Sequence, residues 1–242
     1  MNYNEFSLLY KEILAKNNLG KYIDDAICHK FFDFYNILVE TNKTMNVTRI
    51  LDAKDAIVKH FADCLLLAEM IPDGEFSLID VGCGGGFPTI PLAIAKKSLK
   101  ITAIDSTSKK VDFVNSTARL LELSNVNAIS ARAEEFIDGK RESFDFATSR
   151  AVARLNVLVE LTVPYVKIGG KFLAMKGSAV HEELDEALGG IKKLGAEVLN
   201  VVDVELLGGE EINSRGVIII EKKSKTPSAY PRKFGQIKNK PL

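Results

Sequence analysis

The chain has 242 residues, of which 46% are hydrophobic and 26% charged, the composition of an ordinary globular protein with a sizeable core. Its 32 basic residues balance 32 acidic residues, so net charge alone argues neither for nor against a nucleic-acid partner. The three cysteines are widely spaced, and neither a basic and apolar leader nor an apolar run of about 20 residues is present. Disulfide-rich secreted and membrane-spanning classes are therefore excluded, and we expect a cytoplasmic protein.

The N-terminal part of the chain is predicted to be helical. Apolar residues recur at helical spacing over residues 6–14 and again over residues 23–38. A polar loop around Asn46 follows, and we expect another helix over residues 55–70 before the turn at Pro72-Asp73-Gly74. We interpret this part of the chain as a helical extension.

From residue 76 onward, short apolar runs alternate with amphipathic segments. This alternation indicates a mainly parallel sheet with both faces covered. Two final apolar runs have no helix between them and indicate an antiparallel pair at one edge of the sheet. Strands are predicted over residues 76–81, 100–104, 126–130, 144–148, 171–175, 197–206 and 216–221, and helices over residues 90–95, 111–121, 155–163 and 180–194. The predicted segments are the extension (1–60), an α/β core (61–223) and a basic C-terminal tail (224–242).

The loop at residues 80–88 joins the first predicted strand to a helix and holds four glycines. Glycines such as Gly82 and Gly84 let the backbone turn sharply and approach a ligand, at the place where doubly wound sheets bind ligands. The next strand ends at Asp105, whose carboxylate could hold both hydroxyls of a ribose. The dinucleotide fingerprint has a third glycine where this chain has Phe87, which would crowd a pyrophosphate. An adenosine compound without phosphates, S-adenosylmethionine, is therefore favoured over NAD.

At these residues the chain resembles a known family, the bacterial small-subunit ribosomal RNA guanine-N7 methyltransferases, also called glucose-inhibited division protein B. The resemblance covers nearly the whole chain. The chain departs from the family pattern at Cys83, where serine or threonine is common, and at Thr89, where glycine is frequent. The motifs that carry the resemblance are Asn46-Val47-Thr48, His60 with Asp63, Asp80-Val81-Gly82-Cys83-Gly84-Gly85-Gly86-Phe87-Pro88, Asp105-Ser106, Lys109-Lys110, Arg132-Ala133-Glu134, Ser149-Arg150-Ala151, Met175-Lys176-Gly177, Tyr230-Pro231-Arg232-Lys233 and Lys240-Pro241-Leu242.

The resemblance implies the class I S-adenosylmethionine-dependent methyltransferase fold, a Rossmann-like doubly wound α/β sheet with an antiparallel last strand, preceded by the helical extension. It implies S-adenosylmethionine as cofactor, a monomer, and methyl transfer to N7 of a guanine in a loop of 16S ribosomal RNA within the 30S subunit. The cofactor-binding residues expected from the family and from the glycine loop are Gly82, Gly84, Phe87, Asp105, Ala133, Glu134 and Arg150.

Transfer to N7 needs no general base, because this nitrogen carries a lone pair and no proton. We therefore expect in-line displacement that depends on positioning, and no catalytic residue beyond a positioning role for Arg150 beside the methyl donor and the incoming base. In an A-form helix N7 faces a deep and narrow groove, so the target base is expected in a loop or splayed out.

The C-terminal tail is the segment with the most unequal charge. Seven basic residues and no acidic residue occur from Lys222 to Lys240, while the other 25 basic residues face 32 acidic ones, a net charge of −7. Such a run is commonly a solvated end, and the alternative is contact with RNA phosphates, which predicts salt-dependent binding. We expect Lys176, Arg232, Lys233 and Lys240 to contact RNA.

Other readings of the sequence explain less of it. A small-molecule methyltransferase or a nicotinamide dehydrogenase would leave the basic tail unexplained, and a non-catalytic RNA-binding module would not need an intact glycine loop. A zinc site built from Cys28, His29, His60 and Cys64 is disfavoured, because these residues lie on apolar helical stripes and no C-x-x-C motif occurs. No metal is therefore expected.

Overall fold

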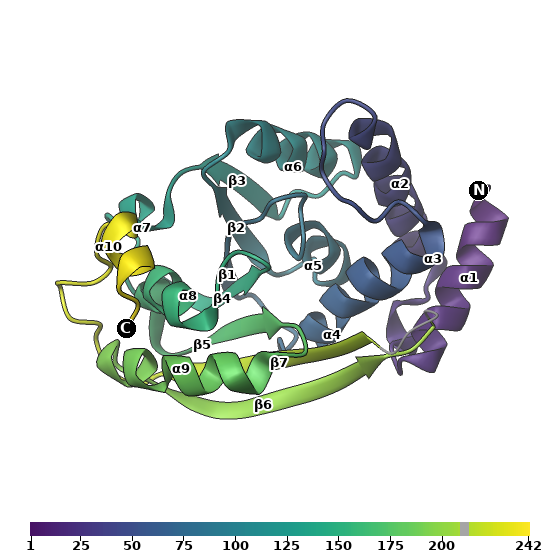
Figure 1. Ribbon diagram of the computed structural model, residues 1–242. Coiled ribbons are helices and arrows are strands. Elements are labelled where there is room, and N and C mark those ends of the chain that lie inside the picture. Colours follow the sequence, from purple (N-terminus) through teal and green to yellow (C-terminus); the bar gives the residue numbers. More distant parts are fainter. Residues whose placement is uncertain (209–212) are drawn as a thin grey trace.

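The computed structural model describes residues 1–208 and 213–242, and its centre is a β-sheet (Figure 1). The strands are β1 (Ser77–Val81), β2 (Lys100–Asp105), β3 (Val126–Ser130), β4 (Phe144–Arg150), β5 (Val166–Lys176), β6 (Ala196–Leu206) and β7 (Asn213–Lys222). Their order in the sheet is β3-β2-β1-β4-β5-β7-β6. Neighbouring strands pair in parallel except at β7, which is antiparallel to both β5 and β6. The doubly wound sheet with an antiparallel last strand that the sequence predicts is therefore confirmed.

Helices precede the sheet and cover both of its faces. The helices are α1 (Tyr3–Lys16), η1 (Gly20–Tyr22), α2 (Asp25–Asn42), α3 (Ala53–Ala56), η2 (Ile57–Ala62), α4 (Asp63–Glu69), α5 (Thr89–Ala95), α6 (Ser108–Leu120), α7 (Ala133–Phe136), α8 (Leu155–Thr162), η3 (Val163–Tyr165), α9 (Val180–Lys193) and α10 (Phe234–Asn239). Strand β5 begins five residues before its predicted start at residue 171, because Gly169 and Gly170 interrupt its apolar pattern. The short helices α7 and α10 lack a strong apolar periodicity, and the sequence analysis did not predict them.

Successive residues along the inner strands enter two different cores. Leu78 of β1 and Ala103 of β2 pack in the core that includes α2, α4, α5 and α6. Their neighbours Ile79 and Ile104 pack in the core that includes α8 and α9. Since side chains of a strand point alternately to opposite faces, both faces of the sheet are buried, as expected for parallel strands.

The N-terminal helices pack against the glycine loop through aromatic side chains. Helix α1 begins with a capping box, in which the Asn2 side chain accepts from the backbone N–H of Glu5 and the Glu5 carboxylate accepts from that of Asn2. Phe34 of α2 lies 5.3 Å, centroid to centroid, from Phe87, which follows the glycines. The extension therefore forms part of the wall that supports the loop.

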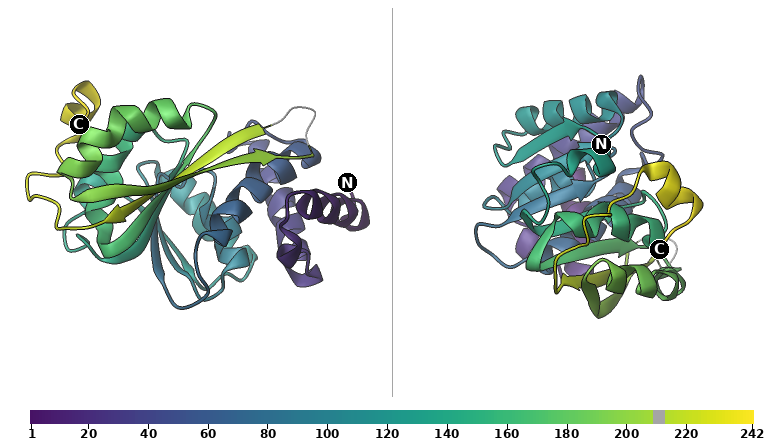
Figure 2. Two further views of the ribbon diagram at one scale, coloured as in Figure 1. Left: turned by 90° about the horizontal axis from the view of Figure 1, so that it is seen from below. Right: turned by 90° about the vertical axis from the view of Figure 1, so that its left-hand side faces the viewer.

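The β6–β7 pair is long and reaches from the sheet to the N-terminal helices, as Figure 2 shows. At its end, the Asn17 side chain donates to the Leu207 carbonyl oxygen at 2.8 Å and accepts from the Leu207 backbone N–H at 2.9 Å. These two bonds join segments that are 190 residues apart in the chain. The extension therefore contacts the core both at the glycine loop and at the end of the β6–β7 pair.

The helix predicted over residues 55–70 is present as α3, η2 and α4, which run on without a break, but its middle turn η2 is a π-helix. In this wider turn the Lys59 carbonyl oxygen accepts a hydrogen bond at 3.2 Å from the Arg150 side chain, at the end of β4. Turns of this kind insert one extra residue and are frequent at functional sites. The sequence pattern gave no sign of the π-helical turn.

The C-terminal tail folds back onto α8 and α9. Ile237 of α10 is buried in the core beneath these helices, and Leu242 lies against Gly190 of α9. Lys222, which belongs to the basic run in the sequence, is buried, and its amino group donates to the Val163 carbonyl oxygen and the Thr226 hydroxyl. The described tail is therefore ordered, and Lys222 does not contribute to an exposed basic surface. Across residues 1–208 and 213–242, the helices are too short or too polar to span a bilayer.

Candidate active site

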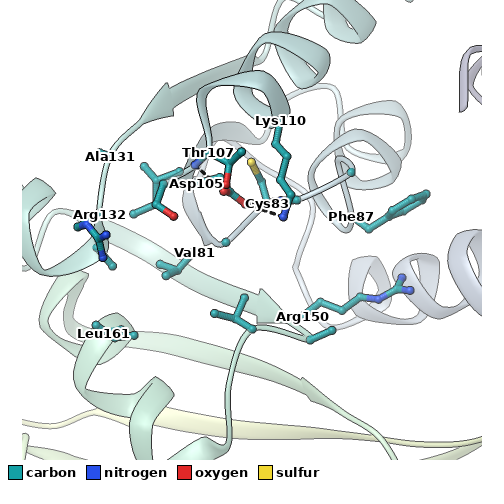
Figure 3. A pocket seen from close by; sticks show the side chains of 18 of the residues that line it. Val81, Cys83, Phe87, Asp105, Thr107, Lys110, Ala131, Arg132, Arg150 and Leu161 are labelled. Atoms are coloured by element: carbon teal, nitrogen blue, oxygen red, sulfur yellow. Dashed lines mark hydrogen bonds and ion pairs between the residues drawn. The ribbon is translucent and has the colours of Figure 1, made fainter. Parts of the chain in front are cut away.

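A cavity of about 530 Å³ opens at the carboxyl ends of β1, β2 and β4 (Figure 3). Ligands bind at this edge in doubly wound sheets, beside the point where the strand order reverses. Val47 from the extension and Phe234 from the tail also line the cavity, so all three predicted segments of the chain contribute to it. The residues that the sequence predicts to bind the cofactor all line this cavity: Gly82, Gly84, Phe87, Asp105, Ala133, Glu134 and Arg150.

The glycine loop forms the floor of the cavity and has little room for side chains. Gly82 has φ +84°, and a Cβ atom there would lie 2.3 Å from Cγ2 of Val152. Its backbone N–H and that of Cys83 both donate to the carbonyl oxygen of Ile104, at 2.8 and 3.0 Å. These contacts hold the loop in a conformation that favours glycine and keep its backbone open to a ligand.

Asp105 lies where β2 ends, and its carboxylate is held by backbone donors. One oxygen accepts from the Gly84 N–H at 3.0 Å and the other from the Thr107 N–H at 2.9 Å. The Lys110 ammonium group lies 3.9 Å away. The remaining lone pairs of this fixed carboxylate are available to the vicinal hydroxyls of a ribose, as the sequence analysis proposes.

Asp80 is buried behind the glycine loop. Its Oδ2 accepts a 2.5 Å hydrogen bond from the Thr89 hydroxyl, while Oδ1 has no hydrogen-bond partner among the described residues. Burial raises the pKa of the Asp80 carboxyl to about 7, although the Thr89 hydroxyl acts in the opposite direction. The threonine at position 89, a departure from the family pattern, therefore donates to this buried carboxyl group.

Arg150 lies at the opposite end of the cavity from Arg132 and Leu161 (Figure 3). Its guanidinium group donates to Nδ1 of His60 at 2.7 Å and stacks over Phe87, 5.3 Å from the ring centroid. Because a guanidinium group can only donate, His60 Nδ1 is the acceptor and Nε2 carries the proton. Nε2 then donates to the Thr48 hydroxyl at 2.8 Å. The chain Arg150–His60–Thr48 thus links the end of β4 to the polar loop before α3.

His60 remains neutral in this arrangement. Burial, with the adjacent Arg150 charge as the second cause, lowers the pKa of His60 from 6.5 to about 3. A neutral imidazole matches the observed acceptor role of Nδ1. His60 therefore orders the loop and Arg150 rather than exchanging protons near neutral pH.

A second cavity, of about 280 Å³, adjoins the first and shares Arg150 and Ala151 with it. Ala151 has φ +56°, an unusual conformation for a residue with a side chain. Asp63 also lines this second cavity, and burial raises the pKa of its carboxyl group although Arg150 and Arg215 lie nearby. Backbone strain and a buried carboxyl group thus occur together at the boundary of the two cavities, as is common at functional sites.

The four residues expected to contact RNA do not lie together. Lys176 lines the second cavity, where its buried amino group pairs with Glu183 at 2.8 Å. Arg232 pairs with the buried Glu160 at 2.6 Å. Lys233 is exposed beside the first cavity, and Lys240 is exposed at the far end of α10. Of the four, Lys233 and Lys240 are thus the ones with freely exposed ammonium groups.

Several residues of the first cavity were not singled out for it from the sequence. Val152 packs against Gly82, Thr107 and Lys110 flank Asp105, and Phe234 reaches the cavity from the tail. Thr107 and Lys110 follow Asp105 so closely in the chain that their position could have suggested a role. Phe234 carries no such signal, because its place depends on the folding back of the tail.

The described residues fit S-adenosylmethionine. The glycine loop allows a ligand to lie close to the backbone, and the fixed Asp105 carboxylate suits a ribose. The volume of the cavity is that of a typical small-molecule site. Among the described residues, no group of three or more histidine, cysteine or acidic side chains could hold a metal ion. The donor set is that of a nucleoside site.

Comparisons with known proteins agree with this geometry. The family model described as rRNA small subunit methyltransferase G matches residues 27–210. Proteins named Ribosomal RNA small subunit methyltransferase G are 46% identical in Staphylococcus carnosus, covering 91% of this chain and 92% of the relative, and 43% identical in Leuconostoc mesenteroides, covering 95% and 97%. The match extends over nearly the whole of each protein.

Solved structures share the fold at low sequence identity. The precorrin-6y C5,15-methyltransferase of Geobacter metallireducens is 18% identical with a TM-score of 0.51, covering 67% of this chain and 87% of that one. TYW2 of M. jannaschii, solved in complex with AdoMet, is 16% identical with a TM-score of 0.50, covering 66% and 76%. The shared part places this chain in the class I methyltransferase fold.

Proposed function

The chain belongs to the rRNA small subunit methyltransferase G family, and we propose that it transfers the methyl group of S-adenosylmethionine to N7 of a guanine in 16S ribosomal RNA. The observation that carries the proposal is the meeting of the Gly82 loop, Asp105 and Arg150 around one cavity, in a chain that covers its relatives almost completely. The work of the protein is then to hold a nucleoside cofactor and an RNA base in line.

Bound S-adenosylmethionine supplies an electrophilic methyl group on a positively charged sulfur. Asp105 would hold the ribose, and the backbone of Gly82 and Gly84 would approach the rest of the ligand. Arg150 borders both cavities and is itself fixed by His60, so it can align the incoming base without moving. Alignment of two reactants in this way contributes about 7–11 kcal/mol in favourable cases.

The proposed reaction needs no general base, because N7 attacks through a lone pair. The neutral, hydrogen-bonded state of His60 supports this, since its two ring nitrogens are engaged by Arg150 and Thr48. We propose that the target guanine lies in a loop of the 30S subunit and that the enzyme acts in the cytoplasm as a monomer, with Lys233 and Lys240 at RNA phosphates.

Methyl transfer with labelled cofactor tests the proposal directly. Purified protein is incubated with 30S subunits and with naked 16S RNA from cells that lack this gene, and the modified base is mapped. We expect incorporation at one guanine, at N7, with 30S subunits as the better substrate. Absence of incorporation into either substrate, with S-adenosylhomocysteine bound normally, would overturn the proposed activity.

A variant pair tests the positioning role of Arg150. We expect Arg150→Gln to lower the single-turnover rate constant by about 100-fold, the effect of losing one fixed charged contact near a reacting group. Arg154→Gln is the matched control, because Arg154 is exposed and pairs with Glu182 and Glu186 on the surface. Equal rates for the two variants would contradict the role of Arg150.

A further inference from the structure

The second cavity has a composition that suits a purine base. Its charged lining consists of two carboxylates and three cationic side chains: Asp63, Glu183, which pairs with Lys176, Arg150, Lys176 and Arg215. It opens beside Ala151, which it shares with the cofactor cavity. Its volume of about 280 Å³ lies just below the range of about 300–1,000 Å³ for sites of drug-sized molecules, which suits a flat base alone.

Asp63 carries the argument, because its carboxylate lines the cavity and is held by ion pairs alone. The side chain is 8% exposed, and its nearest cations are Arg150 Nη1 at 3.4 Å from Oδ2 and Arg215 Nε at 3.7 Å from Oδ1. Within the part of the chain that the structure describes, neither oxygen accepts a hydrogen bond. Each oxygen thus has one ion-pair contact, and its remaining lone pairs are available to donors of a ligand in the cavity that Asp63 lines.

Guanine is the base whose free edge offers those donors. Its N1–H and N2–H lie side by side and match the two oxygens of one carboxylate. Adenine presents an acceptor at N1 and would leave that nitrogen facing a negative charge, and the pyrimidines have no N7 to methylate. On this edge a carboxylate therefore selects guanine.

We propose that the second cavity holds the target guanine, with Asp63 accepting from N1–H and N2–H so that N7 faces the boundary with the cofactor cavity. The proposal rests on the proposed function and names the residue that recognises its substrate base. The Watson–Crick edge, with N1 and N2, lies on the side of the purine away from N7. When Asp63 holds that edge, N7 is left directed toward the cofactor cavity. Arg215, which also lines the cavity, is a suitable donor for O6 of the same base.

The charge that moves during the reaction also favours a carboxylate here. The N7 lone pair forms the new N–C bond, the S–C bond breaks with its electron pair going to sulfur, and the positive charge leaves the sulfonium and appears on the purine. Methylation thus makes the N1–H and N2–H donors more positive as the transition state forms. A fixed carboxylate on that edge stabilises the transition state more than the ground state, which is the condition for acceleration.

The test compares guanosine with inosine, which lacks the N2 amino group but keeps N7, O6 and N1–H. The 30S subunits are reconstituted with 16S RNA that carries one or the other nucleoside at the mapped position. For the wild-type protein we expect the single-turnover rate constant to fall about tenfold or more with inosine, as for loss of a hydrogen bond to a charged group. Wild-type protein that methylates both substrates equally would overturn the proposal without any variant.

Asp63→Asn identifies the residue that reads the base. We expect about a 100-fold lower rate constant with guanosine and a guanosine-to-inosine ratio that falls to within about twofold of one. Asp185→Asn makes the same chemical change on the exposed side of α9, outside both cavities, and keeps the wild-type ratio. The ratio is the deciding quantity, since a merely structural role of Asp63 would slow both substrates alike and leave it unchanged.

Two further measurements separate the possible failures. The affinity for S-adenosylhomocysteine, measured by calorimetry, should stay within about threefold of wild type in Asp63→Asn and so report a folded protein. Equilibrium binding of guanosine-containing and inosine-containing subunits, measured with S-adenosylhomocysteine present, should show the same loss of discrimination without any methyl transfer. If wild-type protein methylates neither substrate, the proposed function fails; if it methylates guanosine but Asp63→Asn keeps the wild-type ratio, only the assignment of Asp63 fails.

Discussion

Arg232 and Glu160 form a two-pronged ion pair that fixes the C-terminal tail to α8. Arg232 Nη2 lies 2.6 Å from Glu160 Oε2, Arg232 Nε lies 2.9 Å from Oε1, and the Arg232 backbone N–H also donates to Oε1 at 2.7 Å. Glu160 is fully buried, so its charge depends on this partner. The arginine expected to contact RNA thus has a structural partner inside the protein.

Replacing Arg232 should destabilise the protein and release the tail. We expect Arg232→Gln to lower the free energy of unfolding by about 3 kcal/mol, because a buried carboxylate is left without its counter-charge. Lys233→Gln, which removes a charge from the adjacent exposed residue, should change it by less than about 0.5 kcal/mol. Urea denaturation measures both values, and similar midpoints for the two variants would contradict this account.

A side chain at Gly82 should weaken cofactor binding. In Gly82→Ala the methyl group would displace Val152, which lines the same cavity, and the positive φ adds strain of about 1–2 kcal/mol. We expect at least a tenfold higher dissociation constant for S-adenosylhomocysteine by calorimetry. Gly20→Ala is the control, since a Cβ atom there meets no atom within 4 Å and the residue lies far from the site in the chain. Unchanged affinity in Gly82→Ala would count against the placement of the cofactor over this loop.

The tail should affect cofactor and RNA through different residues. Phe234→Ala removes an aromatic side chain from the cofactor cavity, and we expect about three- to tenfold weaker binding of S-adenosylhomocysteine. The double variant Lys233→Gln with Lys240→Gln should leave that affinity unchanged. It should instead reduce the slope of log affinity for RNA against log salt by about 1.4, or about 0.7 for each lost phosphate contact. An unchanged salt slope would show that these lysines do not contact RNA.

His60 should make the stability depend on pH. Its pKa falls from 6.5 to about 3 on folding, so between these values this residue binds more protons in the unfolded chain, and its own contribution to the free energy of unfolding decreases as the pH is lowered. The Asp80 carboxyl, whose pKa is raised to about 7, contributes in the opposite direction. From pH 7 to pH 5 the loss due to His60 amounts to about 2 kcal/mol. In His60→Gln this contribution is absent, so the difference in free energy of unfolding between variant and wild type should shift by this amount in favour of the variant over that interval, measured by urea denaturation. Parallel curves for wild type and variant would mean that the histidine titrates alike in both states.

The predictable part of the site is the part that is local in sequence. The glycine loop and Asp105 are recognisable because the conformation of a sharp turn restricts its residues, and because a carboxylate that ends the next parallel strand must lie beside that turn. The alternation of apolar runs and amphipathic segments along the sequence likewise predicts the mainly parallel sheet. These features need no knowledge of distant contacts.

The remaining parts depend on contacts between distant segments. Arg150 contacts His60 across 90 residues, and Arg232 reaches Glu160 across 72. A charged residue in a motif gives no indication of whether its partner will be RNA or another side chain. For this reason the sequence suggested RNA contacts for Arg232 and Lys176, whereas the structure gives each an ion-pair partner within the chain.

The π-helical turn η2 has a consequence for how this gene can change. A turn of this kind takes up its extra residue locally, so the helix before it and the helix after it keep their register. Deleting one codon within the turn would therefore restore regular helix geometry without rotating α4 or Asp63. It would close the wide turn in which the Lys59 carbonyl oxygen accepts from Arg150, so the deletion should disturb the arginine while the fold is kept.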